Sequence, residues 1–126
     1  MKPKKLINHA IEAQGNAQCK YSDFPVGCAL LTENGDIVFG CNIESAVYPS
    51  TLCAERVAIY SAVSKGITDF KAIAIVSNNA AKPCGSCRQI MYEYLGDVPI
   101  YIADSKGENF SEHSIRELLP YPFGWK

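Results

Sequence analysis

Two cysteine-bearing segments constrain the fold of this chain more than any other feature. The first is Thr51-Leu-Cys-Ala-Glu-Arg56 and the second is Pro83-Cys-Gly-Ser-Cys87. Each lies where a helix is expected to begin, and Cys84 and Cys87 share one helical face because they are three residues apart. Zinc is commonly bound by thiolates, and three protein ligands leave a fourth position for water. The sequence therefore predicts that Cys53, Cys84 and Cys87 meet around a catalytic zinc ion.

The histidines and the other cysteines lack this ligand spacing. Cys28 and Cys41 fall within apolar strand patterns and are expected to pack in the core. His9 and His113 lie far from both segments in the sequence and are expected at the surface or in caps. A structural zinc site normally has four protein ligands, and no fourth ligand stands out here. A redox Cys-x-x-Cys pair is a weaker alternative because it leaves Cys53 without a role.

Composition predicts a soluble single domain. The chain has 126 residues, of which 48% are hydrophobic, enough for one core within residues 1–126. Its net charge is -1, and the basic run from Lys2 to Lys5 is short for a nucleic-acid footprint. No apolar run approaches the roughly 18 residues of a membrane span, and the N-terminus lacks the apolar core of a signal peptide. We therefore expect a cytoplasmic protein that binds neither polynucleotide nor membrane.

Periodicity predicts an α/β fold. A hairpin is expected around Asn34-Gly35, and the order of elements then favours a mixed sheet with helices on both faces. Both cysteine segments open helices, so they are expected to meet at the strand ends, where α/β folds place ligands. The predicted helices cover residues 3–15, 53–64, 84–95 and 114–118, and the predicted strands cover residues 26–31, 37–41, 71–77 and 99–103.

Glu55 and Arg56 are candidate functional residues because they lie close to Cys53, a predicted zinc ligand, in the sequence. A helical glutamate alone is usually solvated, but a carboxylate near a metal can take a proton from water and pass it to a leaving group. Three thiolates around Zn²⁺ leave a formal charge of about -1, which weakens the metal as a Lewis acid. Arg56 is one helical turn from Cys53 and is expected to offset that charge.

Taken together, these features resemble the short, homotetrameric zinc-dependent cytidine deaminases. The resemblance covers nearly the whole chain and implies a three-layer α/β/α sandwich with a mixed sheet of about five strands, forming one catalytic domain over residues 1–126. The ordered set of matching segments is far more specific than a Cys-x-x-Cys alone. The segments are Phe24-Pro-Val-Gly-Cys-Ala-Leu-Leu31, Asn42-Ile-Glu-Ser-Ala-Val-Tyr48, Cys53-Ala-Glu-Arg56, Pro83-Cys-Gly-Ser-Cys-Arg-Gln89, Glu117-Leu-Leu-Pro120 and Phe123-Gly124.

The resemblance also implies a reaction and a role for each matching residue. Cytidine and 2′-deoxycytidine would be deaminated to uridine and 2′-deoxyuridine in pyrimidine salvage, with one zinc per subunit and Glu55 moving the proton. The substrate would be bound by a set of residues near the zinc, and a neighbouring subunit's pocket would be completed by two aromatic residues. The first set is Phe24 near the base, the backbone of Ala54 at the base edge, and Asn42 and Glu44 at the ribose, mainly at its 3′-hydroxyl. The second set is Tyr48 and Phe123.

Several alternatives stay open at the level of sequence. Phe24 could be a core residue, and Asn42 and Glu44 could simply line a loop. Blasticidin-type deaminases share the zinc motifs and also carry a tryptophan near the end, as Trp125 does here. The segment from Phe24 to Gly27, with Asn42 and Glu44, favours a cytidine pocket instead. An enzyme that edits bases in RNA or DNA should need a basic channel for the strand, and none is evident.

Overall fold

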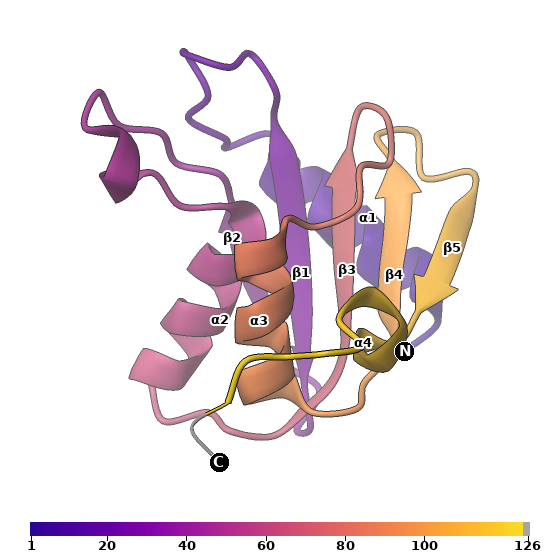
Figure 1. Ribbon diagram of the computed structural model, residues 1–126. Helices are drawn as coiled ribbons and strands as arrows, with labels where there is room; N and C mark the ends of the chain where they lie inside the picture. The colour runs from indigo at the N-terminus through magenta and orange to yellow at the C-terminus, as the bar shows by residue number, and fades with distance from the viewer. Residues whose placement is uncertain (125–126) are drawn as a thin grey trace.

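Residues 1–124 are described by a computed structural model, and they form a three-layer α/β/α sandwich (Figure 1). Trp125 lies outside the described residues. One helix covers one face of a five-stranded sheet, and two longer helices with a short fourth one cover the other face. The helices are α1 (Pro3–Gln14), α2 (Ala54–Ser64), α3 (Gly85–Leu95) and α4 (Ile115–Leu118), with a 3-10 turn η1 (Tyr48–Ser50). The strands are β1 (Val26–Thr32), β2 (Ile37–Cys41), β3 (Phe70–Ser77), β4 (Ile100–Asp104) and β5 (Phe110–His113).

The sheet is mixed, with strand order β2-β1-β3-β4-β5. β1 pairs antiparallel with both β2 and β3, and β4 pairs antiparallel with β5. β3 and β4 run parallel, and α3 lies in the connection between them. The carboxyl end of β3 therefore leads directly into the loop that carries Cys84, at the edge where α/β sheets bind ligands.

The central strands are buried on both faces because their side chains alternate between two cores. In β1, Cys28 and Leu30 pack with α2 and α3, whereas Ala29 and Leu31 pack with α1. The same period of two continues along β3, whose buried residues are apolar on both faces except for Ser77 at the end of the strand. This arrangement confirms the predicted strand pattern and the predicted core role of Cys28. Among residues 1–124, no helix is both long and apolar enough to cross a membrane.

Three details differ from the sequence expectations. β5 was not predicted, because Phe110–His113 is polar and largely exposed at the edge of the sheet, so it shows no apolar alternation. Cys41 is only half-buried, since β2 forms the other edge. Helices α2 and α3 each begin one residue later than expected, and Cys53 and Cys84 occupy their N-cap positions.

Gly40 in β2 determines how closely α2 approaches the sheet. A Cβ atom at this position would lie 2.3 Å from the carbonyl oxygen of Ala54 and 2.8 Å from the amide nitrogen of Ala58. Any larger residue would therefore push away the first turn of α2. That turn carries Glu55, so the contact helps to position the functional residues described below.

Candidate active site

The three predicted zinc ligands lie together at the N-termini of α2 and α3. The sulfur atoms of Cys53, Cys84 and Cys87 all lie within 4.8 Å of one another. The Sγ–Sγ distance is 4.0 Å between Cys53 and Cys84 and 3.4 Å between Cys84 and Cys87. Tetrahedral zinc with Zn–S bonds of about 2.3 Å places its sulfurs about 3.8 Å apart. The three side chains are thus positioned to hold a zinc ion. Within residues 1–124 the cluster has three such ligands, which leaves a fourth position open.

The local fold favours a thiolate at Cys53, whereas the hydrogen bond with Cys53 and burial raise the pKa of Cys87. Cys53 and Cys84 are N-caps and Cys87 lies in the first turn of α3, where free N–H groups and the helix dipole stabilise negative charge. A hydrogen bond from Cys87, helped by Arg56, lowers the pKa of Cys53 to about 5. The Nη2 atom of Arg56 lies 3.4 Å from the Sγ atom of Cys53. Arg56 therefore stands where a cation can offset the thiolate charge.

Glu55 is buried in the first turn of α2, with only 4% of its surface exposed. Desolvation by burial raises the pKa of its carboxyl to about 7. A carboxyl with this pKa can both accept and release a proton near neutral pH, which is the requirement for a proton shuttle.

A cavity of about 280 Å³ lies beside the cysteines and contains the predicted binding residues. Its walls come from the segment before β1, the loop after β2, the start of α2 and the loop before α3. This volume suits a small molecule, and it excludes a folded macromolecule. The predicted site residues that line it are Phe24, Asn42, Glu44, Cys53, Ala54, Glu55 and Cys84.

Asn42 and Glu44 also hold the segment that precedes β1. The Nδ2 atom of Asn42 donates to the carbonyl oxygen of Phe24 at 2.9 Å, and its Oδ1 atom accepts from the N–H of Val26 at 2.9 Å. Glu44 accepts hydrogen bonds from the hydroxyl of Ser22 and from two backbone N–H groups, and these lower its pKa. Glu44 is half-buried in this chain, and its contact with Ser22 was not predicted from the sequence.

Tyr48 and Phe123 lie outside the cavity of their own chain. Tyr48 is 75% exposed and borders a neighbouring hollow of about 330 Å³ that also includes Ser22 and Glu44. Phe123 is 64% exposed, and its backbone exchanges two hydrogen bonds with the side chain of Gln89. Neither aromatic ring thus completes the pocket of the subunit that carries it.

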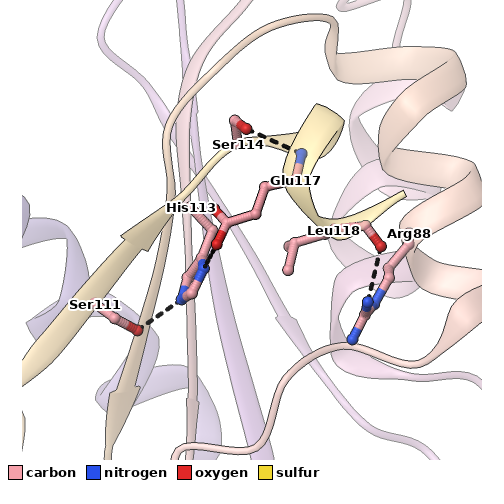
Figure 2. A network of polar contacts seen from close by, with 6 residues as sticks. All are labelled: Arg88, Ser111, His113, Ser114, Glu117 and Leu118. Carbon is pink, nitrogen blue, oxygen red and sulfur yellow. Dashed lines mark hydrogen bonds and ion pairs between the residues drawn. The ribbon is translucent and has the colours of Figure 1, made fainter. Parts of the chain in front are cut away.

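Arg88 is a further residue that sequence reasoning missed. Its Nε atom donates to the carbonyl oxygen of Pro83 at 2.7 Å, and its Nη1 atom donates to that of Leu118 at 2.8 Å. Figure 2 shows the second bond joining α3 to the end of α4. Arg88 therefore fixes the residue before Cys84 and ties the cysteine turn to the C-terminal segment.

His113 has only 11% of its side chain exposed, and it does not belong to the cysteine cluster. Its ring contacts the hydroxyl of Ser111 at 2.8 Å and the carboxylate of Glu117 at 3.3 Å (Figure 2). His113 therefore belongs to a local network that links β5 to α4. The backbone N–H of Glu117 in turn donates to the hydroxyl of Ser114, which is the N-cap of α4.

Comparison with known proteins agrees with this geometry. Residues 1–102 match the family model described as the cytidine and deoxycytidylate deaminase zinc-binding region. The chain belongs to this deaminase family. Over 126 residues it is 44% identical to the cytidine deaminase of Sporosarcina psychrophila, covering 98% of this chain and 92% of the relative. The crystal structure of a cytidine deaminase from Burkholderia pseudomallei superposes with a TM-score of 0.91 and 37% identity, covering 98% of this chain and 100% of that chain.

Within this family, the comparisons support a blasticidin-S deaminase less well than a cytidine deaminase. A blasticidin-S deaminase from Bacillus cereus is 34% identical over 108 residues, covering 78% of this chain and 76% of the relative. Both kinds of enzyme thus resemble this chain in sequence. Identity and coverage both favour the cytidine deaminases.

Replacing Arg56 with alanine should move the acidic limb of the deaminase pH profile to higher pH, by about one unit. The guanidinium favours the anionic forms of neighbouring groups, so its loss raises the pKa of each group that must lose a proton there. In metal-free protein, the pKa of Cys53 should rise from about 5 for the same reason. Both shifts can be measured, the first from rates against pH and the second from the ultraviolet absorbance of the thiolate.

Arg116→Ala is the matched control for this prediction, because Arg116 is exposed on α4 and belongs to neither the cysteine cluster nor the cavity. It should leave both profiles unchanged. An Arg56→Ala protein with the original pH profile would show that the cysteine charge is balanced in another way.

Proposed function

We propose that this chain is a homotetrameric cytoplasmic enzyme of pyrimidine salvage that hydrolytically deaminates cytidine and 2′-deoxycytidine, with residues 1–126 as one catalytic domain. The observation that carries the proposal is a buried carboxyl, Glu55, beside three cysteine sulfurs at the wall of one small cavity. Zinc, when bound by these sulfurs, supplies a Lewis acid that lowers the pKa of water.

Glu55 moves the proton in the proposed reaction. It takes a proton from the attacking water and delivers it to N3 of the cytosine ring while oxygen bonds to C4. It then helps to move the proton of the new C4 hydroxyl to the amino nitrogen, the C4–N bond breaks, C4=O forms and ammonia leaves. The ring becomes uracil, and no oxidant or reductant is needed. A pKa of about 7 in the metal-free protein fits a group that must hold the proton only briefly.

The proposed binding residues surround the place where the nucleoside would lie. The backbone of Ala54 is beside Glu55 and is assigned to the base edge, and Phe24 is assigned to the base face. Asn42 and Glu44 are assigned to the ribose. Although both already hold backbone groups, an amide oxygen has two lone pairs and a carboxylate has about four sites, so each keeps room for a hydroxyl.

Exposed aromatic rings support the proposed assembly. Neither Tyr48 nor Phe123 is among the residues that line the cavity of its own chain, and the side chain of Tyr48 is 75% exposed. We assign them to the pocket of a neighbouring subunit, so each site would need a second chain to be complete.

The substrate assignment is tested by following ultraviolet absorbance with zinc-loaded protein and five separate compounds: cytidine, 2′-deoxycytidine, cytosine, cytidine monophosphate and blasticidin S. The two nucleosides should be turned over faster than the others, because the pocket is assigned contacts to both base and sugar. Efficient turnover of blasticidin S with neither nucleoside used would establish the alternative substrate. Turnover of none of these compounds would defeat the proposed function.

A further inference from the structure

We propose that Ser22 is a positioning residue that sets the preference of this site for nucleosides with a 3′-hydroxyl group. The inference rests on the proposed function, and it assigns a role to a residue outside the zinc cluster. Ser22 lines the cavity, and its one hydroxyl joins the residue assigned to the sugar, Glu44, to the residue assigned to the base, Phe24.

The carboxylate of Glu44 is oriented by three donors from one turn of chain. The backbone N–H groups of Tyr21 and Ser22 each donate to Oε1 at 3.0 Å. The hydroxyl of Ser22 donates to the other oxygen, Oε2. Because the backbone bonds involve only Oε1, the Ser22 hydroxyl is the group that fixes Oε2. Oε2 therefore faces an incoming hydroxyl in a defined direction only while Ser22 is present.

The same hydroxyl holds the backbone of Phe24. Its oxygen accepts from the N–H of Phe24 at 3.1 Å. Asp23 has a φ angle of 55°, a left-handed conformation that turns the chain back toward Ser22. On the other side, Asn42 donates to the carbonyl oxygen of Phe24 at 2.9 Å. Phe24 is thus held at both its N–H and its C=O, and Ser22 supplies the first contact.

Loss of the hydroxyl should change binding more than folding. Ser22 is exposed and lies in a loop, so its removal leaves no buried polar group unpaired in the core. Oε2 of Glu44 would then be free to turn toward solvent. A substrate with a 3′-hydroxyl would lose a well-aligned acceptor, whereas a substrate without that hydroxyl would lose only the contribution of Phe24. The effect is therefore a change in preference as well as in affinity.

The test compares cytidine with 3′-deoxycytidine in the zinc-loaded Ser22→Ala protein. The KM for cytidine should rise about tenfold with kcat within about twofold, as expected for one charge-assisted hydrogen bond. The ratio of kcat/KM for cytidine to that for 3′-deoxycytidine should fall about fivefold. Ser22→Thr keeps the hydroxyl and should restore both values. Ser45→Ala is the matched control, because Ser45 also accepts an N–H two residues on, from Val47 at 3.0 Å.

The outcomes separate this inference from the proposed function. An unchanged ratio in Ser22→Ala, with kcat retained, would overturn the inference while leaving the deaminase assignment intact. Failure of Ser22→Thr to restore the ratio would also overturn it, because the hydroxyl would not be the cause. If the unsubstituted protein turned over neither nucleoside, the proposed function would be wrong and this inference would fall with it.

Discussion

Replacing Glu55 with glutamine should reduce kcat by roughly 10⁴-fold while zinc stays bound. Glutamine has nearly the shape of glutamate, so the first turn of α2 and the adjacent Cys53 should keep their positions. Its amide cannot take a proton from water or carry one to the ring. Because Glu55 is 4% exposed, solvent has little access to replace it. Rates with cytidine and metal content by atomic absorption would check the two halves of the prediction.

Glu33→Gln is the control for Glu55→Gln, since Glu33 is exposed in the turn after β1. It should have the original activity. Turnover by Glu55→Gln within tenfold of the unsubstituted protein would remove Glu55 from the reaction. Loss of zinc together with activity would instead make Glu55 a residue that supports the metal centre.

The second large effect is expected from Cys87→Ala, which should abolish both zinc binding and activity. Cys87 supplies one of three ligands, and two thiolates cannot form the site described here. Cys28→Ala provides a close control, because Cys28 and Cys87 are both 0% exposed in the same core cluster. Each substitution removes one buried sulfur, at a cost of about 1–2 kcal/mol in the free energy of unfolding. Only Cys87→Ala should also lose the stabilisation that bound zinc provides.

Metal content and thermal unfolding with and without a chelator distinguish the two variants. The chelator should lower the Tm of Cys28→Ala and of the unsubstituted protein, and it should leave that of Cys87→Ala unchanged. Equal zinc content in Cys87→Ala and Cys28→Ala would contradict the assignment of Cys87 as a ligand.

The sequence predicted the pair of Cys84 and Cys87 and most of the fold from local patterns, whereas the meeting of Cys84 with Cys53, 31 residues away, was predicted from the expected α/β topology. Cys84 and Cys87 are three residues apart at the start of a helix, where the helix dipole stabilises thiolates. This spacing was sufficient to predict both residues as zinc ligands on one helical face. The apolar alternation of β1 and β3 was similarly visible in the chain. β5 was missed because an exposed edge strand has little apolar pattern to detect.

Residues that act through long-range side-chain contacts could not be predicted in this way. Ser22 meets Glu44, Arg88 meets Leu118 and Gln89 meets Phe123, across 22, 30 and 34 residues of sequence. Serine in a loop and arginine or glutamine on a helix are ordinary surface residues, and only the tertiary fold gives them partners. The half-buried state of Glu44 has the same origin, since it depends on how the chain around Ser22 packs.

The most direct test of the account is the release of ammonia from cytidine by metal-free protein to which zinc is returned stepwise. The account predicts no release without metal, a rise in rate proportional to added zinc, and a plateau at one zinc per chain, with one ammonia formed per uridine. Full activity in the metal-free protein, or no ammonia at any zinc concentration, would contradict it.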